Sequence, residues 1–349
     1  MPGWPPDPLF GDIPDQVTTQ ACWNGIAMKS IALNPYSNFV AYLEAKDFSL
    51  LATAVAERKC REAIGAGTFQ EAADLFRPDP LCPTCGTKAF RNGKNSAGKK
   101  RYICPSCNKR FSALTGTILE YSKKDLATWK DFITLMCHNA SIDLAAEMCD
   151  IAHNTAFEWR HRVFATVDGY QDRLVLKDRI WLDETYVSDS SLLRGPDFRP
   201  KRGISKQKIC ITLAIDIHKN AIAKVFGHGR PSVREQKEAL LGHIKEGSVI
   251  VCDKEKAHSP LIKAAKCEAE FYKADPKDPV YLEAMQMINN YNSWIKRFLL
   301  RYPGMKKANL QSYLNWFAYL FRVKRDEDKW PKTERVIRHL LITDARFRS

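Results

Sequence analysis

Four cysteines stand in two Cys-x-x-Cys pairs, Cys82 with Cys85 and Cys104 with Cys107, and eighteen residues separate the pairs. Two such pairs on a hairpin-sized segment can arrange four thiolates tetrahedrally around one Zn²⁺. The alternative is two disulfides, but the chain has eleven cysteines, an odd number, and no apolar signal-peptide core at its start. We therefore expect a structural zinc site in a reducing compartment.

Two aspartates form the second candidate site. Asp183 and Asp253 each follow a β-rich apolar run, in the segments 179–187 and 248–253. If these strands are neighbours, both carboxylates meet at one edge of the sheet. Mg²⁺ takes oxygen ligands from one or two carboxylates plus substrate phosphate, and a second ion about 4 Å away can clamp the attacking and leaving oxygens. The alternative is that each aspartate only begins a turn.

A third set of polar residues lies on a predicted helix near residues 287–299. Its polar stripe consists of Asn289, Asn292, Ser293 and Lys296. Lys296 lies almost above Asn289, because seven residues make nearly two helical turns. The stripe is either part of a site or the solvated face of an amphipathic helix.

The elements around the aspartates predict a mixed sheet. Apolar runs at 179–187, 208–217 and 221–226 precede a helix at 232–243 and the strand at 248–253. Three strands, a helix and a fourth strand beside the first are the order of an RNase H-like domain.

Upstream, helical spacing covers 124–137 and 143–148, and a break at 149–152 leads into another helix. This is a helix-turn-helix pattern, unless it is a plain helical hairpin. In the last helix Ala156, Trp159, Val163 and Val167 should face inward. The polar residues left to approach a DNA groove are His153, Asn154, Thr155, Glu158 and Arg162. Residues 38–76 show core-like spacings typical of short helices, for example at Phe48, Leu51 and Val55.

The composition favours a nucleic-acid partner. The 349 residues carry 54 Lys and Arg against 40 Asp and Glu, a net charge of +14. Eight cations lie between or just after the cysteine pairs: Lys88, Arg91, Lys94, Lys99, Lys100, Arg101, Lys109 and Arg110. Such a density favours phosphate contacts over a merely solvated face. No apolar run reaches the length of a membrane span, so no membrane partner is expected.

These patterns predict a multi-domain α+β chain with a zinc ribbon, a helix-turn-helix and an RNase H-like mixed α/β core. Its expected parts are a loose N-terminus with short helices (1–76), the ribbon (77–118), the helix-turn-helix region (119–175), the catalytic core (176–325) and a basic C-terminal tail (326–349). Residues 1–27 are rich in Pro and without period, so Met28 is an alternative start to Met1.

The ordered motifs resemble Merlin-related insertion-sequence transposases over about residues 80–322. The similar stretches are the cysteine pairs followed by Arg110-Phe-Ser-Ala-Leu-Thr-Gly-Thr, the helix-turn-helix, Trp181-Leu-Asp-Glu-Thr-Tyr, Arg202-Gly-Ile-Ser-Lys, the Asn289 to Lys296 helix, Tyr302-Pro-Gly-Met, and Leu310-Gln-Ser-Tyr-Leu-Asn-Trp-Phe. The resemblance implies a DDE-type transposase of a bacterial cytoplasm that acts at the nucleoid.

The resemblance also implies roles for residues and partners. Asp183 and Asp253 match the two metal aspartates, Asn289 the third-ligand position, and Lys296 the lysine that follows it, with Arg297 near DNA phosphate. The implied cofactors are catalytic Mg²⁺ or Mn²⁺ and structural Zn²⁺. The implied partners are double-stranded DNA, as terminal inverted repeats and as target, and further copies of the chain in a dimer or larger synaptic complex.

The third position is often Glu in this group, whereas this chain has Asn289. An amide oxygen can ligate a cation but brings no charge and is not a useful base. Glu184 is an unlikely substitute, because adjacent residues of a strand face opposite sides. Two alternatives stay open: a catalytically silent DNA-binding regulator, and a nuclease that hydrolyses without strand transfer.

Overall fold

The computed structural model describes most of the chain beyond residue 43. The described residues are 44–96, 98–189, 199, 203, 205–253, 258–302, 305–325 and 332–343. The expectations for residues 1–27 and for the start at Met28 lie outside them. The chain divides into two compact units, Met1–Ala52 and Thr53–Ser349, and the account below concerns the second unit unless stated.

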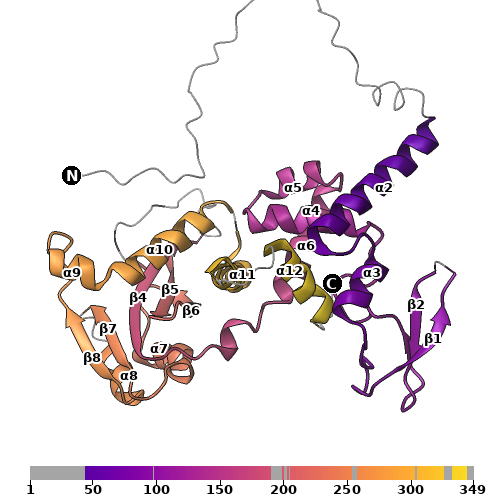
Figure 1. Cartoon of the computed structure of the whole chain (residues 1–349). Coiled ribbons are helices and arrows are strands. Elements are labelled where there is room, and N and C mark those ends of the chain that lie inside the picture. Colours follow the sequence, from indigo (N-terminus) through magenta and orange to yellow (C-terminus); the bar gives the residue numbers. More distant parts are fainter. Residues whose placement is uncertain are drawn as a thin grey trace, which may run out of the picture. The chain divides into compact units, whose positions relative to one another are not determined.

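The second unit contains a five-stranded mixed sheet with the order β6-β5-β4-β7-β8 (Figure 1). The strands are β4 (Arg179–Ser188), β5 (Lys208–Asp216), β6 (Ala221–His228), β7 (Val249–Asp253) and β8 (Glu268–Tyr272). β4, β5 and β6 pair antiparallel, whereas β7 and β8 run parallel to β4. β5 is almost entirely buried, which explains its continuous apolar sequence. The expected neighbourhood of the first and fourth strands is therefore observed.

Helices cover both faces of this sheet (Figure 1). They are α7 (Val233–Leu240) with the 3₁₀ turn η3 (Leu241–His243), α8 (His258–Ala264), α9 (Pro279–Ala284), α10 (Gln286–Leu299) and α11 (Lys307–Arg325). Side chains such as Trp181 and Val251 pack with α10 and α11. Their neighbours Leu182 and Cys252 pack with α7 and α8 on the other face. This alternation follows from the two-residue period of a strand.

A helical region precedes the sheet. It contains α2 (Ala45–Ile64), which begins in the first unit, α3 (Phe69–Phe76), α4 (Leu126–Cys137), α5 (Ile142–Met148), α6 (His153–Ala165) and the 3₁₀ turn η1 (Gln171–Arg173). Trp129 of α4 stacks on Trp159 of α6 with ring centroids 3.8 Å apart, and Phe132 meets Trp159 edge-on. Ser141 caps α5 by accepting from the Leu144 N–H.

A buried amide network joins the helical region to the sheet. Gln171 of η1 donates to the Asn315 side chain of α11 at 2.6 Å and accepts from the backbone N–H of Ala223 on β6. Asn315 in turn donates to the carbonyl of Asp168. Because buried amides are costly when unpaired, this network fixes the connector against the edge strand.

Two expectations for the ends of the chain need correction. The short helices expected in 38–76 include one 20-residue helix, α2, and its Phe48, Leu51 and Val55 are exposed instead of core. The expected basic tail contains α12 (Lys332–Ile342), whose apolar side chains are buried in the core that also holds α4 and α6. Both differences arise because apolar spacing does not say whether a partner surface exists.

The remaining strands form a three-stranded antiparallel sheet of β1 (Phe90–Lys94), β2 (Lys100–Ile103) and β3 (Arg110–Phe111). The sequence did not predict β8, α8 or α9, which are short and partly polar. Among the described helices none combines the length and the apolar character needed to cross a membrane.

Candidate active site and metal centre

The two predicted aspartates lie on neighbouring parallel strands. Trp181 of β4 pairs with Val251 of β7, and Asp183 and Asp253 each lie two residues further along. They therefore share one face of two strands that lie about 4.8 Å apart, with Asp183 in the middle of β4 and Asp253 at the end of β7. Asp183 is half-buried, and the side chain of Asp253 is 28% exposed. The structure thus brings together two carboxylates that are seventy residues apart in sequence.

The surroundings of Asp183 oppose its ionisation. Burial raises the pKa of Asp183 most, and the nearby carboxylates of Glu184 and Asp253 raise it further. Hydrogen bonds from the Glu184 N–H and from Asn292 lower it, and the net result is a pKa raised to about 6. Two carboxylates held together in a partly dry site repel each other until a cation joins them. The pair is therefore suited to a divalent cation.

Helix α10 presents its polar stripe to this site. Asn292 donates through Nδ2 to Asp183 Oδ2 at 3.3 Å. Its amide oxygen is buried and has no hydrogen-bond partner among the described residues. An orphaned oxygen beside a carboxylate fits a cation or a bound ligand. The buried residues Ile288, Tyr291 and Ile295 lie beside this stripe on α10 and hold the helix in this rotation.

The two other predicted residues of α10 are less constrained. Asn289, one turn before Asn292, is half-buried, and within the described part of the chain its side chain makes no hydrogen bond. Lys296, one turn after Asn292, is exposed, as is Arg297. Trp181 fixes the start of α10 by donating from Nε1 to the carbonyl of Ala284 at 2.7 Å. The contact of Asn292 with Asp183 was not predicted, although Asn292 was part of the stripe.

A buried histidine joins the site to the other face of the sheet. His258, the first residue of α8, has a side chain only 2% exposed. Its Nε2 lies 3.0 Å from Glu184 Oε1, and its Nδ1 lies 3.3 Å from Asp253 Oδ1. Burial lowers the pKa of His258, but contacts with Asp253, Cys252 and Glu184 outweigh burial and raise it to about 12.

Glu184 faces α7 and α8, as the strand period predicts, and it also accepts from Gln236 Nε2 at 2.5 Å. The sequence analysis missed His258 and Gln236 as neighbours of the aspartates. The only available signal for His258 was its position five residues after Asp253. Nothing local marked Gln236, because its contact with Glu184 spans 52 residues.

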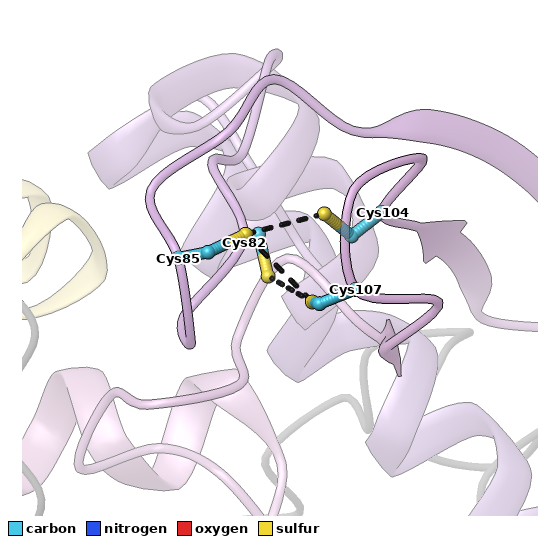
Figure 2. Close-up of side chains that lie close together, drawn as sticks. All are labelled: Cys82, Cys85, Cys104 and Cys107. Carbon is cyan, nitrogen blue, oxygen red and sulfur yellow. Dashed lines mark hydrogen bonds between the residues drawn. The ribbon is translucent and has the colours of Figure 1, made fainter.

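The four predicted cysteines point toward one another from two loops (Figure 2). Cys82 Sγ lies 3.5 Å from Cys107 Sγ, and Cys85 Sγ lies 3.4 Å from Cys104 Sγ. All four sulfurs lie within 4.8 Å of one another. Four thiolates at about 2.3 Å from one Zn²⁺ are about 3.8 Å apart, so the cluster fits a tetrahedral zinc site.

The two loops are built alike. The N–H of Gly86 donates to the carbonyl of Cys82, and the N–H of Asn108 donates to the carbonyl of Cys104. Gly86 and Asn108 have φ angles of 70° and 55°, in the left-handed region that Gly and Asn tolerate best. Contacts with Thr87 lower the pKa of Cys85 to about 6, which favours the thiolate that binds metal.

Most of the eight cations around the cysteines are exposed, and the strand β1 is exposed along its whole length. Lys100 is the exception, because it pairs with Asp74 of α3 at 2.5 Å. The Lys100 N–H also donates to Gln70 of α3, so these contacts attach the small sheet to the helical region.

The helices α5 and α6 lie close to the predicted bounds, with a turn at 149–152. Ala156, Trp159, Val163 and Val167 are buried as predicted. Among the predicted DNA-facing residues, His153, Asn154 and Glu158 are exposed, whereas Thr155 and Arg162 are half-buried. His161 is half-buried against Phe157, Phe164 and Tyr313.

Residues 175–322 match the family model of the ISXO2-like transposase domain. The resemblance to insertion-sequence transposases is therefore confirmed. A curated relative from Halobacterium salinarum, described as an uncharacterized protein in transposable element ISH50, is 23% identical over 277 residues, which cover 73% of this chain and 89% of the relative. This relative spans more of the chain than the family model does.

A weaker likeness exists to a chain in a solved simian T-cell lymphotropic virus intasome in complex with PP2A regulatory subunit B56 gamma. The TM-score is 0.28 at 13% identity, over 41% of this chain and 48% of that chain, so this chain spans about half its length. This likeness is too low to support a functional argument.

The ISXO2-like segment, residues 175–322, contains the whole aspartate site. It includes both aspartates, Glu184, His258 and the polar stripe of α10. The cysteine cluster and the helices α5 and α6 lie before it. The chain therefore combines a segment that matches the ISXO2-like transposase domain with a separate four-cysteine cluster and a helical region.

Proposed function

We propose that the protein is a DDE-type DNA transposase that cleaves the ends of an insertion sequence and transfers the strands into target DNA. The observation that carries this proposal is the convergence of Asp183 and Asp253 on adjacent parallel strands within the ISXO2-like segment. The sheet order β6-β5-β4-β7-β8, with three antiparallel strands followed by two parallel ones, supports an RNase H-like core.

The residues of the site fit divalent cations. Asp183, Asp253 and Asn289 would hold Mg²⁺ or Mn²⁺, and the buried free oxygen of Asn292 is a further oxygen donor beside Asp183. When bound, such cations activate water or a 3′-hydroxyl and stabilise the charge that develops on the phosphodiester. The raised pKa of Asp183 supports this assignment, because a cation would relieve the repulsion between the carboxylates.

Lys296 and Arg297 would contact DNA phosphate close to the reacting strand. Both are exposed on α10, and Lys296 continues the polar stripe that begins at Asn289. Contacts to phosphate position a duplex without reading its sequence. Helix α10 would therefore position the end of the DNA strand, and the adjacent carboxylates would hold the cations that act in the reaction.

Recognition of the terminal inverted repeats would come from the region before the sheet. The cysteine cluster fits a zinc ribbon with a basic surface, and α5 with α6 fits a helix-turn-helix that presents His153, Asn154 and Glu158. Two element ends must be joined, so we expect a dimer or a larger synaptic complex at the bacterial nucleoid.

Strand transfer of a labelled duplex tests this proposal. The duplex carries the inverted repeat that flanks the gene, and the assay contains plasmid target and Mg²⁺ or Mn²⁺. We expect a joined product with the wild type and none with Asp183→Asn, which keeps the shape of the side chain but loses its charge. Cleavage without any joined product would indicate a nuclease instead.

A catalytically silent DNA-binding regulator is the second candidate. The observation that favours it is the neutral Asn289 where related enzymes often have Glu. In this case the duplex would be bound specifically but cleaved in neither metal, and Asp183→Asn would bind it as the wild type does.

A further inference from the structure

We infer that His258, fixed by Glu184 and Gln236, positions the Asp253 carboxylate for cation binding. This inference rests on the proposed function, which makes Asp253 a metal ligand. It assigns a role to three residues that lie on the face of the sheet opposite α10. His258 is a positioning residue, because it acts on the cation site through Asp253.

The imidazole of His258 lies between two carboxylates. His258 spans two strands, with Nε2 facing Glu184 of β4 and Nδ1 facing Asp253 of β7. Both partners are carboxylate oxygens, which only accept hydrogen bonds when ionised. The ring therefore forms an ion-pair contact with Asp253 Oδ1 at 3.3 Å and links this carboxylate to Glu184.

The histidine and its partners are firmly held. The side chains of His258 and Glu184 are 2% and 8% exposed, and Gln236 is fully buried. Gln236 lies on α7, whose first turn is fixed by a capping box between Ser232 and Glu235. A ring buried between two carboxylates, one of them braced by Gln236, has little freedom to rotate.

Glu184 is placed so that it contacts both aspartates, one directly and one through His258. Its backbone N–H donates to Asp183 Oδ1 at 2.8 Å, while its side chain reaches Asp253 through His258. One residue therefore touches Asp183 directly and Asp253 through one intermediary. A buried carboxylate is expensive to maintain and is weak evidence for stability. The buried Glu184 carboxylate would therefore serve to orient the two aspartates.

Partners that orient metal ligands through hydrogen bonds change metal affinity by about 10–100-fold when they are removed. The test uses the full-length, zinc-loaded protein and measures free Mn²⁺ by electron paramagnetic resonance during a titration. His258→Gln and His258→Asn form a matched pair. The Asn amide nitrogen lies as many bonds from Cα as Nδ1, which faces Asp253, and the Gln amide nitrogen as many as Nε2, which faces Glu184.

We expect His258→Gln to weaken Mn²⁺ binding by about 10–100-fold. His258→Asn should weaken binding less than His258→Gln does, because a donor to Asp253 remains although the contact with Glu184 is lost. If His258 had only a structural role, there would be no reason for His258→Asn, which loses the contact with Glu184, to bind Mn²⁺ more tightly than His258→Gln. Glu184→Gln, which keeps the shape of the side chain, should weaken binding in the same direction. His218→Gln, at an exposed histidine paired with Asp178, is the control and should leave the affinity unchanged.

Equal Mn²⁺ affinity in the wild type, His258→Gln and Glu184→Gln would overturn the inference while leaving the proposed function intact, provided that Asp183→Asn still abolishes binding. Equal affinity in the wild type and Asp183→Asn would instead overturn the proposed cation site, and the inference with it. If His258→Gln does not fold, Glu184→Gln gives the same decision.

Discussion

Asn289 and Asn292 lie one turn apart on the polar stripe of α10. Different observations favour each of them as a third cation ligand. The spacing to Lys296 and the family resemblance favour Asn289. The contact with Asp183 and the unpaired amide oxygen favour Asn292. The chemistry is the same in both cases, because a neutral amide oxygen would complete a site formed by two carboxylates.

Substitution of each asparagine separates these assignments. We expect Asn289→Ala to lower strand transfer in Mg²⁺ by about 10–100-fold, as for loss of a weak ligand or its support. Asn289→Glu should keep or raise activity, because it adds a charged oxygen ligand. Asn292→Ala is the matched comparison and should lose less. An unaffected Asn289→Ala beside an inactive Asn292→Ala would transfer the role to Asn292.

Asp183 provides a pH-dependent prediction for the protein without added divalent cation. Its pKa is raised to about 6 in the folded state, so the ionised side chain disfavours folding. The contribution of this group to stability is complete at pH below about 4 and is lost as pH rises through about 6. A shift of about two pKa units corresponds to at most about 3 kcal/mol.

We therefore expect Asp183→Asn to gain stability relative to the wild type between pH 4.5 and pH 7.5, measured by thermal unfolding. The Asn side chain of the variant loses some hydrogen bonds that Asp183 accepts. This loss does not depend on pH, so it cancels when the stability difference is compared between the two pH values. Added Mg²⁺ should raise the melting temperature of the wild type at pH 7.5 and leave that of Asp183→Asn unchanged. A pH-independent difference between the two proteins would contradict this account.

At the scale of elements, the cysteine cluster is connected to the core. Cys82, Cys104, Tyr102 and Phe111 belong to the same buried cluster as α4 and α12. The small sheet has three short strands, too little to fold without additional support. Zinc would supply that support.

Metal analysis tests this dependence. We expect one zinc per chain in the wild type and less than a stoichiometric amount in Cys104→Ser, together with a lower melting temperature and weaker DNA binding. Cys267→Ser is the control, because Cys267 is half-buried outside the cluster and donates to the carbonyl of Lys245. Stoichiometric zinc in Cys104→Ser would remove that residue from the site.

At the scale of the whole molecule, the charge balance and the sites point to the same partner. The chain has 14 more basic than acidic residues, and exposed cations surround the cysteine cluster and continue from the α10 stripe. Long-range attraction to a polyanion would bring DNA to both regions. The carboxylates of Asp183 within β4 and Asp253 at the end of β7 are the local exception to this positive charge, as expected for a cation site.

The sequence alone was sufficient for the local elements and for the cysteine site. The bounds of β4 to β7 and of α4 to α6 follow from apolar period, because each element buries one or both of its own faces. The cysteine site follows from spacing, because four ligands on two tight loops need little help from the rest of the chain. The proximity of Asp183 and Asp253 could also be predicted, since Asp183 lies in one strongly apolar strand and Asp253 ends another.

Only the tertiary structure decided which side chains share a site. His258, Gln236 and Glu184 meet because α7 and α8 pack on the same face of the sheet, and Asn292 meets Asp183 because the buried side of α10 sets its rotation. The exposure of α2 and the burial of α12 were decided in the same way. The apolar periodicity of the sequence predicts which face of an element is apolar. Only packing between distant segments determines what that face, and the polar face of the same element, will contact.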